Sequence, residues 1–296
     1  MIKNGIYAAA LTPMNDDLSI NFPLFANHCH HLLSNGCDGL VIFGSTGEAN
    51  SFSVEERKKA LEAIVNEGIP ASKLIVGSGC ASLTDSVELS CHAMNLGVSR
   101  LLILPPFYYK NINDKGLFGW FEELIRRVDI KHLQILLYHI PQISGTGFSF
   151  EIIKKLIKTF PNEIAGVKDS SGDWEHMKEL CRRFPDLKIF SGNEKFLLDI
   201  LNVGGAGTIS ATLNVSSKLA GELYSTWNTP VAKGLQEKLT RRRKEIEQFT
   251  MIPALKHLMS ESTGNPDWCT VRPPLVALTT EDGNALIDNW EKGLST

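Results

Sequence analysis

A lysine and a tyrosine close two successive apolar runs in the second half of the chain. Tyr138 ends the run over residues 133–138, and Lys168 ends the run over residues 164–168. Burial at a strand end disfavours the charged ammonium and so favours the free amine that attacks a carbonyl. A buried tyrosine hydroxyl needs a hydrogen-bond partner and can act as an acid, a base or a proton relay. These residues indicate covalent carbonyl chemistry on Lys168, assisted by Tyr138.

Each of these residues also has a structural explanation when it is taken alone. A lysine at a strand end can extend along apolar surface to water, and a core tyrosine can hydrogen-bond to the backbone. Adjacent strands of a sheet make the two side chains neighbours. That coincidence favours the catalytic interpretation.

The segment 44–48 reads Gly-Ser-Thr-Gly-Glu and follows another apolar run. Its glycines let a ligand approach the backbone, and Ser45 and Thr46 add hydroxyl groups beside free amides. The lysine of a nucleotide-binding Gly-x-x-x-x-Gly-Lys-Ser/Thr loop is missing. The loop therefore suits a small carboxylate, although a plain structural turn would use the same glycines.

Polar residues also follow the last two apolar runs. Gly192, Asn193 and Glu194 come after the run over residues 187–191, and Ser210 ends the run over residues 206–210. Together they predict a polar pocket wall that suits a hydroxylated chain rather than a flat aromatic aldehyde.

The elements that must position these residues alternate along the chain. Short apolar runs predict buried parallel strands, because most of them are continuously apolar. Segments with apolar residues at three-to-four spacing predict helices between them, several with Ser or Asp as N-cap. The strands are expected at residues 6–11, 39–43, 73–76, 101–104, 133–138, 164–168, 187–191 and 206–210, and the helices at 22–34, 53–67, 83–96, 114–128, 149–159, 174–184 and 194–202.

Eight strand–helix units predict an α/β fold, and they fit a closed (β/α)8 TIM barrel better than an open doubly wound sheet. We assign residues 1–226 to the barrel, as the catalytic domain, and residues 227–296 to a C-terminal helical extension with helices over 231–259 and 281–294. In such a barrel the chemistry lies where the strands end, and the residues singled out above all lie there.

The composition excludes several classes of function. The 296 residues include 30 Lys plus Arg and 33 Asp plus Glu, for a net charge of −3. This balance argues against nucleic acid as a partner, since phosphate binding needs concentrated cations. No stretch approaches the roughly 20 apolar residues of a membrane helix, and the N-terminus does not read as a secretory signal. We therefore expect a cytoplasmic protein without a membrane partner.

The cysteines and histidines predict no metal site. The six cysteines are scattered without a Cys-x-x-Cys pair, which indicates reduced thiols. His28, His30 and His31 cluster on the first predicted helix and are expected on its flank. His139 should point away from Tyr138, because successive strand residues face opposite ways.

Five segments carry a resemblance to the family of 4-hydroxy-tetrahydrodipicolinate synthase and N-acetylneuraminate lyase, from about residue 5 to the C-terminal helices. In chain order they are GSTGE, PFYY, LYHIP, GVKDSSGD and SGNE. The resemblance implies a class I, Schiff-base-forming aldolase or lyase on a (β/α)8 barrel. It also implies a small-molecule 2-oxo acid substrate, a homotetramer, and no metal or organic cofactor.

The same resemblance implies roles for single residues. Lys168 matches the lysine that condenses with the C2 carbonyl of pyruvate or a 2-oxo acid, and Tyr138 matches the tyrosine that relays protons. Ser45 matches the hydroxyl that links Tyr138 to a second tyrosine, which reaches into the neighbouring subunit's site. Tyr108 is the counterpart of that second tyrosine. Thr46, with the amides of Ser45 and Thr46, matches the holder of the pyruvate carboxylate.

The two branches of the family differ at the substrate's far end. The synthases usually carry an arginine five residues after the strand-end tyrosine, where Ile143 stands here and cannot pair with a second carboxylate. Three other segments look like the lyase branch: Ile-Pro-x-x-Ser-Gly over residues 140–145, Phe-Tyr-Tyr over 107–109 and Ser-Gly-Asp over 171–173. In that branch a polar pair after the seventh strand binds sugar hydroxyls, and Asn193 and Glu194 stand at those positions. That branch commonly has Asp where Asn193 stands.

We therefore expect reversible cleavage of a 2-oxo-3-deoxy sugar acid, or of N-acetylneuraminate, to pyruvate and an aldehyde. Two alternatives use the same imine on Lys168. One is 4-hydroxy-tetrahydrodipicolinate synthase, which condenses pyruvate with aspartate semialdehyde, and the other is a dehydratase.

Two further classes of function explain less of the sequence. A phosphate cradle at residues 204–207 would leave Lys168 and Tyr138 without a role. The basic run over residues 241–244 could mark a binding module. Glutamates at 237, 245 and 247 flank it, however, and favour a solvated or salt-bridged helix face.

Overall fold

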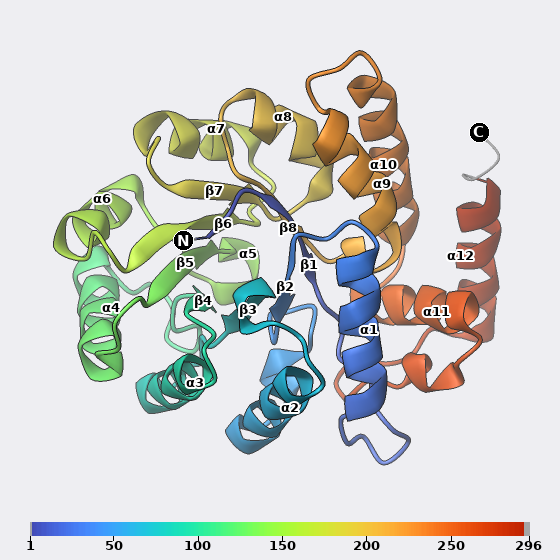
Figure 1. The fold of residues 1–296 in the computed structure, drawn as a ribbon, viewed down its shortest axis with the longest axis horizontal. Coiled ribbons are helices and arrows are strands. Elements are labelled where there is room, and N and C mark those ends of the chain that lie inside the picture. Colours follow the sequence, from blue (N-terminus) through green and yellow to red (C-terminus); the bar gives the residue numbers. More distant parts are fainter. Residues whose placement is uncertain (1, 293–296) are drawn as a thin grey trace.

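The computed structural model describes residues 2–292, and its centre is a closed barrel of eight parallel strands (Figure 1). The strands pair in sequence order, and the last pairs with the first. The predicted (β/α)8 TIM barrel is therefore confirmed. The strands are β1 (Gly5–Ala9), β2 (Gly39–Ile42), β3 (Leu74–Gly77), β4 (Arg100–Ile103), β5 (Gln134–His139), β6 (Ile164–Asp169), β7 (Lys188–Ser191) and β8 (Gly207–Ser210).

Helices surround the barrel and return the chain to the start of each next strand (Figure 1). A short extra helix, α5 (Pro141–Ser144), follows β5 directly. The surrounding helices are α1 (Phe22–Ser34), α2 (Val54–Asn66), α3 (Leu83–Asn95), α4 (Asp114–Val128), α6 (Phe150–Thr159), α7 (Trp174–Arg183), α8 (Leu197–Asn202) and α9 (Leu213–Thr226).

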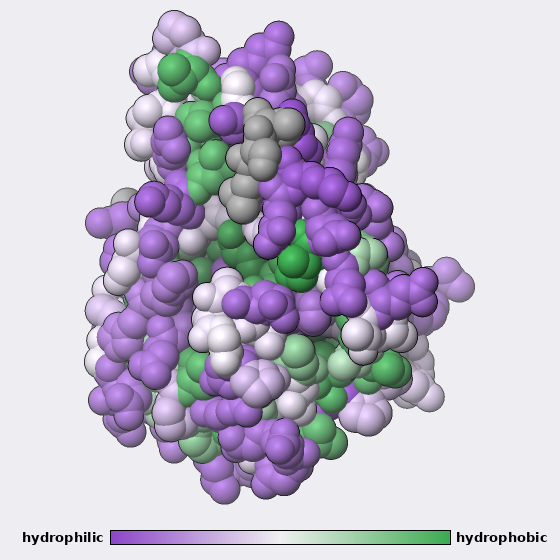
Figure 2. Space-filling view, turned by 90° about the vertical axis from the view of Figure 1, so that its right-hand side faces the viewer, coloured by the Kyte–Doolittle hydropathy of each residue, from purple (hydrophilic) through white to green (hydrophobic). Residues whose placement is uncertain are grey.

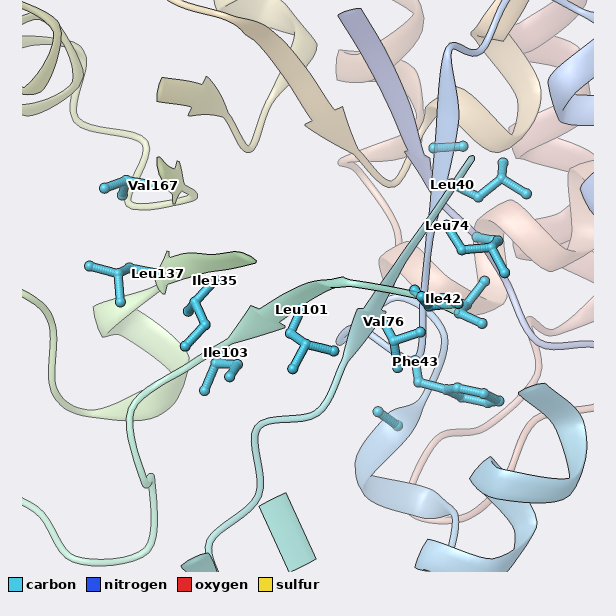
Figure 3. Packing of buried hydrophobic residues seen from close by; sticks show 14 of the residues in the cluster. Leu40, Ile42, Phe43, Leu74, Val76, Leu101, Ile103, Ile135, Leu137 and Val167 are labelled. Carbon is cyan, nitrogen blue, oxygen red and sulfur yellow. The ribbon is translucent and has the colours of Figure 1, made fainter. Parts of the chain in front are cut away.

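The strands are buried on both faces, which explains their nearly continuous apolar sequences. Outward-facing residues form the larger core with the helices, and Figure 3 shows part of it, including Leu74, Leu101 and Ile135. Inward-facing residues, such as Tyr7 and Phe190, fill the barrel and meet edge-on at 5.5 Å between ring centres. The barrel is therefore a packed core whose chemistry is confined to its rim.

One predicted helix is divided in the structure. The region over residues 231–259 forms α10 (Ala232–Ile246) and α11 (Met251–Thr263), which a short turn separates. Pro253 explains the break, because its ring would clash with the carbonyl four residues earlier in a continuous helix. The last predicted helix is α12 (Thr280–Lys292), and the expected continuation to residue 294 lies outside the described residues.

A buried ion pair joins the C-terminal helices to the barrel. Lys256 on α11 places its Nζ 2.6 Å from Oε1 of Glu48, which follows β2, and both side chains are almost fully buried. The backbone N–H of Arg272 donates to the other carboxylate oxygen of Glu48 at 3.2 Å. The C-terminal region therefore fixes the carboxylate of Glu48, the last residue of the Gly-Ser-Thr-Gly-Glu segment, by an ion pair and a hydrogen bond.

Between residues 2 and 292, no helix combines the length and apolar character that crossing a membrane requires.

Replacing Lys256 by Met should destabilise the protein strongly, because the Glu48 carboxylate would stay buried without its cation. Breaking one side of a buried ion pair typically costs about 3–5 kcal/mol in the free energy of unfolding. Urea denaturation of the Lys256→Met variant measures this loss. In the double variant Glu48→Gln/Lys256→Met, most of the stability should return.

The matched control is Lys58→Met, which removes a surface cation that pairs with Glu55 and Glu88. Its loss should stay within about 1 kcal/mol. A Lys256→Met variant no less stable than Lys58→Met would contradict the anchoring role.

Candidate active site

Lys168 and Tyr138 meet inside the barrel because β5 and β6 pair in one particular register. The two residues are direct partners across the strands, and the Lys168 Nζ lies 4.2 Å from the centre of the Tyr138 ring. Both side chains are 4% exposed. The sequence predicted this neighbourhood, and the structure brings an amine and a phenol together at the buried rim.

The register that joins them depends on an irregularity in β6. Ile135 pairs with Ile164, but Leu136 pairs with Gly166, so Ala165 is skipped. Without that shift, Tyr138 would face Val167 instead of Lys168. A Cβ atom at Gly166 would lie 2.1 Å from the Lys188 carbonyl oxygen, so only glycine fits there.

The phenol of Tyr138 lies in surroundings that promote proton transfer. Burial by itself raises the pKa of Tyr138, but the positive charge of Lys168 opposes it, as do hydrogen bonds with Ser45, Ser170 and Lys168. The net effect holds this pKa below its usual value. A phenol of this kind gives up its proton more readily than a free tyrosine does.

Ser170 is a member of this group that the sequence analysis missed. It follows Lys168 by two residues, and alternation along an extended chain turns both side chains the same way, so a signal was present. Its backbone N–H donates to the His139 carbonyl at 2.8 Å, which fixes the loop after β6. A Cβ atom at Gly192 would lie 1.9 Å from the Ser170 Oγ, so Gly192 makes room for this hydroxyl.

The loop after β2 is built to present its backbone. Phe43 adopts a left-handed conformation with φ of +55°, which is strained for a residue with a side chain. Its ring is held edge-on by Phe25 and Phe52, and this packing offsets the strain. Ser45 and Thr46 follow at the rim, half-buried, and their backbone N–H groups donate to no acceptor within residues 2–292. These groups can bind an anion such as a carboxylate.

Glu194 and Ser210 form a buried polar wall, as the sequence predicted, but with two additional members. The Glu194 carboxylate is fully buried and accepts hydrogen bonds from Ser210 Oγ and Thr212 Oγ1. Arg243 on α10 donates through Nη1 to both Glu194 and Ser210, at 3.1 Å in each case. Asn193 lies beside this wall and accepts the Lys195 N–H at 2.9 Å through its side-chain oxygen.

Arg243 gives the basic run over residues 241–244 a more specific role than the sequence showed. The sequence predicted a solvated or salt-bridged face, and Arg243 is indeed salt-bridged, to Glu194 and Glu247, with a side chain that is only 12% exposed. Its Nε donates to Glu247 at 2.8 Å, and Lys195 also pairs with Glu247 at 3.0 Å. The carboxylates of Glu194 and Glu247 are therefore balanced by two cations, Arg243 and Lys195. Sequence spacing could not show this, because Arg243 belongs to the extension and not to a strand end.

Tyr108 lies apart from the other candidates. It is 73% exposed on the loop after β4, and its ring meets Tyr109 edge-on at 5.3 Å. Ile143, on α5, is also exposed at 60%.

A second cluster lies behind the site, on the outer side of β5 and β6. His139 points away from Tyr138, as alternation predicts, and stacks on His176 of α7 at 4.5 Å between ring centres. His176 Nδ1 lies 2.6 Å from the Asp169 carboxylate, and ligating atoms of the three residues fall within 4.8 Å of one another.

Hydrogen bonds within the protein already occupy this cluster. The Phe148 N–H donates to His139 Nδ1 at 3.0 Å, so neutral His139 carries its proton on Nε2. Asp169 also accepts from the N–H and hydroxyl of Ser171, and these bonds with His176 hold its pKa low against the effect of burial. A hydrogen-bonded support for the strand ends explains the cluster better than a metal site does.

Comparison with known proteins agrees with this geometry. Residues 3–291 match the model of the dihydrodipicolinate synthetase family. The chain belongs to this family. An uncharacterized DapA-like lyase of Chloroflexus aurantiacus is 34% identical over 97% of this chain and 96% of its own.

Solved structures extend the likeness to both branches of this family. A dihydrodipicolinate synthase from Agrobacterium tumefaciens superposes with a TM-score of 0.90, at 33% identity over 98% of this chain and 99% of its own. An N-acetylneuraminate lyase from Fusobacterium nucleatum superposes with a TM-score of 0.87, at 26% identity over 98% of both chains. Members of the family are pyruvate-dependent carbon–carbon lyases, and this chain is an enzyme of that class.

Replacing Tyr138 by Phe should slow proton transfer while leaving the amine of Lys168 in place. Exchange of the pyruvate methyl protons with D2O, followed by NMR, measures that step without knowledge of the second substrate. We expect a loss of about 10²- to 10⁴-fold, the usual contribution of a positioned acid–base group. Tyr109→Phe, at an exposed tyrosine, should exchange at the native rate. Equal rates in the two variants would remove Tyr138 from its role.

Proposed function

We propose that this enzyme cleaves a 2-oxo acid reversibly to pyruvate and an aldehyde through an imine on Lys168. Its substrate would be a 2-oxo-3-deoxy sugar acid or a compound of the N-acetylneuraminate type. The observation that carries the proposal is the buried pairing of Lys168 with Tyr138. Among the cation–ring contacts of residues 2–292, this one alone involves a tyrosine.

The reaction would proceed in three steps on these side chains. The Lys168 amine attacks C2 of the substrate, water leaves, and an iminium ion forms. Tyr138 then takes the proton of the C4 hydroxyl, the C3–C4 bond breaks, and its electron pair forms an enamine while the aldehyde departs. A proton returns to C3, and water hydrolyses the imine to release pyruvate and the free amine.

Other residues would serve binding and proton relay. The N–H groups of Ser45 and Thr46, with the Thr46 hydroxyl, would hold the carboxylate of the 2-oxo acid. Ser45, which hydrogen-bonds to Tyr138, would link it to a second tyrosine. The exposure of Tyr108 is compatible with service in a neighbouring subunit's site, so we propose a homotetramer. The chemistry needs no metal or organic cofactor, and we place the enzyme in the cytoplasm.

The polar wall supports a hydroxylated substrate. Gly192, Asn193, Glu194 and Ser210 would line the part of the site that receives the sugar chain. Because Arg243 is already paired with Glu194 and Glu247, the wall offers hydrogen-bond donors and acceptors but little net charge. Ile143, at the position of the synthases' arginine, provides no pair for a second carboxylate.

A second candidate is condensation of pyruvate with aspartate semialdehyde. The Agrobacterium tumefaciens relative that superposes so well is named a dihydrodipicolinate synthase. In addition, the Lys110 Nζ lies 3.1 Å from the Ser144 carbonyl, close to Ile143, and offers a cation near the position of the missing arginine. A dehydratase that uses the same imine is a further alternative.

A substrate screen separates these activities. Pyruvate release would be measured over a set of 2-oxo-3-deoxy sugar acids and N-acetylneuraminate, with aspartate semialdehyde condensation and water loss assayed in parallel. We expect pyruvate release from a hydroxylated acid to be the fastest reaction. A faster condensation with aspartate semialdehyde would contradict the proposed substrate and favour Lys110 as the carboxylate partner.

The wall itself can be tested in the same screen with Arg243→Gln. This substitution removes the charge-assisted hydrogen bonds that Arg243 donates to Glu194 and Ser210, worth about 1.5–3 kcal/mol. We expect KM for the hydroxylated acid to rise by roughly 10- to 100-fold, because the wall residues are then no longer held in place. The kcat should change less, and Arg243→Lys should recover part of the loss. Lys244→Gln, on an exposed side chain of the same helix, is the matched control. Equal KM values for the Arg243→Gln and Lys244→Gln enzymes would contradict a role for this wall in substrate binding.

A further inference from the structure

Arg272 lies in the C-terminal extension, and its guanidinium uses every hydrogen-bond donor that it has. Nε and Nη2 donate to the Leu18 carbonyl at 3.0 and 2.8 Å. Nη1 donates to the Ser51 carbonyl at 2.7 Å, and Nη1 and Nη2 each donate to one carboxylate oxygen of Glu56. An arginine side chain has five N–H groups, so none is left over. These bonds fix both the position and the orientation of the guanidinium.

The guanidinium of Arg272 also supports the start of the loop after β2. It lies over the ring of Phe52, with its central carbon 4.3 Å from the ring centre. Phe52 is buried and meets Phe43 edge-on at 6.4 Å between ring centres. Phe43 begins this loop in its left-handed conformation, so the strained residue packs, through one intervening ring, against a fixed guanidinium.

The end of the same loop is held by two groups from the extension. Glu48, the last residue of the Gly-Ser-Thr-Gly-Glu segment, has a φ of +54°, which is strained for a residue with a side chain. Its carboxylate binds the Lys256 ammonium and the Arg272 N–H. Lys256 Nζ also donates to the Thr270 carbonyl at 2.7 Å, so the ion pair is joined to the segment that carries Arg272.

Ser45 and Thr46 lie between these two supports. The next residue, Gly47, is fixed as well, because its carbonyl accepts from Thr12 Oγ1 at 2.8 Å and a Cβ atom there would lie 3.0 Å from the Ala10 carbonyl oxygen. Ala10 and Thr12 follow β1, so the barrel holds the middle of the loop and the extension holds its ends. The direction of the Ser45 and Thr46 N–H groups therefore depends on residues far away in the chain.

Stability alone does not account for the two cations of the extension. Figure 2 faces the side of the molecule that carries α11 and α12, and hydrophilic side chains cover much of it. Lys256 instead is fully buried, and the Arg272 side chain is only 17% exposed. Removing two charges from water costs about as much as their attraction returns, so a buried ion pair adds little net stability. The stability of the chain therefore gives little reason for charged residues at these positions.

We propose that Arg272 and Lys256 are positioning residues for the candidate active site. They hold the start and the end of the loop after β2, and this fixes the N–H groups of Ser45 and Thr46 in the direction that suits a bound carboxylate. Their role rests on the proposed function, in which those N–H groups hold the carboxylate of the 2-oxo acid. Both cations act through the loop, and neither takes part in the chemistry on Lys168.

The geometry of the loop is tested first, without a substrate. Hydrogen–deuterium exchange of the full chain, measured by mass spectrometry, follows the N–H groups that donate hydrogen bonds within the segment 44–52. Arg272→Gln removes the charge-assisted bonds that hold this segment. We expect its N–H groups to exchange roughly 10-fold faster than in the native enzyme, because the segment opens more easily.

Binding is then measured by borohydride trapping on Lys168 over a range of ligand concentrations, with pyruvate and with methyl pyruvate. The methyl ester has no carboxylate charge, so it gains less from the N–H groups of the loop. Arg272→Gln should raise the half-saturating concentration of pyruvate roughly 10-fold and that of methyl pyruvate far less. The amount of adduct at saturation should stay at the native level, because Lys168 is unchanged.

The double variant Glu48→Gln/Lys256→Met separates positioning from stability. Most of its stability should return, but no cation then holds the end of the loop. We expect this variant to be folded and yet to lose the native preference for pyruvate over methyl pyruvate. It decides the question even if Arg272→Gln fails to fold.

Two further variants serve as controls. Arg272→Lys keeps the charge but not the fork of five donors, so it should recover part of the preference for pyruvate. Arg182→Gln is the matched control, because the exposed Arg182 side chain on α7 binds Glu179 through two hydrogen bonds of 2.7 and 2.6 Å. This variant should show the native exchange and the native preference.

Native exchange in the segment 44–52 of Arg272→Gln would overturn the proposal, and so would a native preference for pyruvate in the double variant. Equal weakening of both ligands in Arg272→Gln would also contradict it. A native enzyme that forms no adduct with either ligand would instead contradict the proposed function. The exchange measurement would then still decide whether Arg272 holds the loop.

Discussion

The pairing of β5 with β6 is the constraint on which the proposed chemistry depends. In a sheet, a slip of one residue turns every side chain to the opposite face. Tyr138 and Lys168 meet inside the barrel because the register shifts at Ala165 and because Gly166 leaves room for the Lys188 carbonyl. Bulges of this kind often lie next to active sites, where they redirect a side chain. Here the bulge converts two ordinary strand ends into an amine–phenol pair.

The surroundings of this pair form hydrogen bonds and packing contacts on both sides of the sheet. Inside, Ser45 and Ser170 hold the phenol, and Gly192 makes room for Ser170. Outside, the stacked rings of His139 and His176 and the Asp169 carboxylate brace the same two strand ends. Pre-organised groups of this kind lower the cost of bringing reacting atoms together, because less freedom is lost at the moment of reaction.

The C-terminal extension contributes more than a cover for the barrel. Lys256 holds the carboxylate at the end of the Gly-Ser-Thr-Gly-Glu segment, and Arg243 completes the polar wall with Glu194. The extension also lines part of a cavity outside the barrel, and α1 and α9 supply the rest of that lining. The candidate active site therefore depends on the C-terminal extension as well as on the barrel.

Sequence patterns predicted the barrel and the reactive pair because both follow from periodicity along single segments. Continuous apolar runs predicted the strands, and strand ends located Lys168 and Tyr138. Features that join distant segments were missed. Arg243 and the His139–Asp169–His176 cluster each depend on contacts between elements far apart in the chain. The division near Pro253 was missed although its cause, a proline, was present in the sequence.

In the proposed reaction, Lys168 is the residue that forms the imine with the substrate. Incubation with pyruvate and borohydride, followed by intact-mass measurement and peptide mapping, identifies the residue that carries the adduct. We expect one reduced pyruvyl adduct for each chain, located on the peptide that contains Lys168, and no adduct in Lys168→Met. A native chain without an adduct, or an undiminished adduct in Lys168→Met, would contradict this role of Lys168.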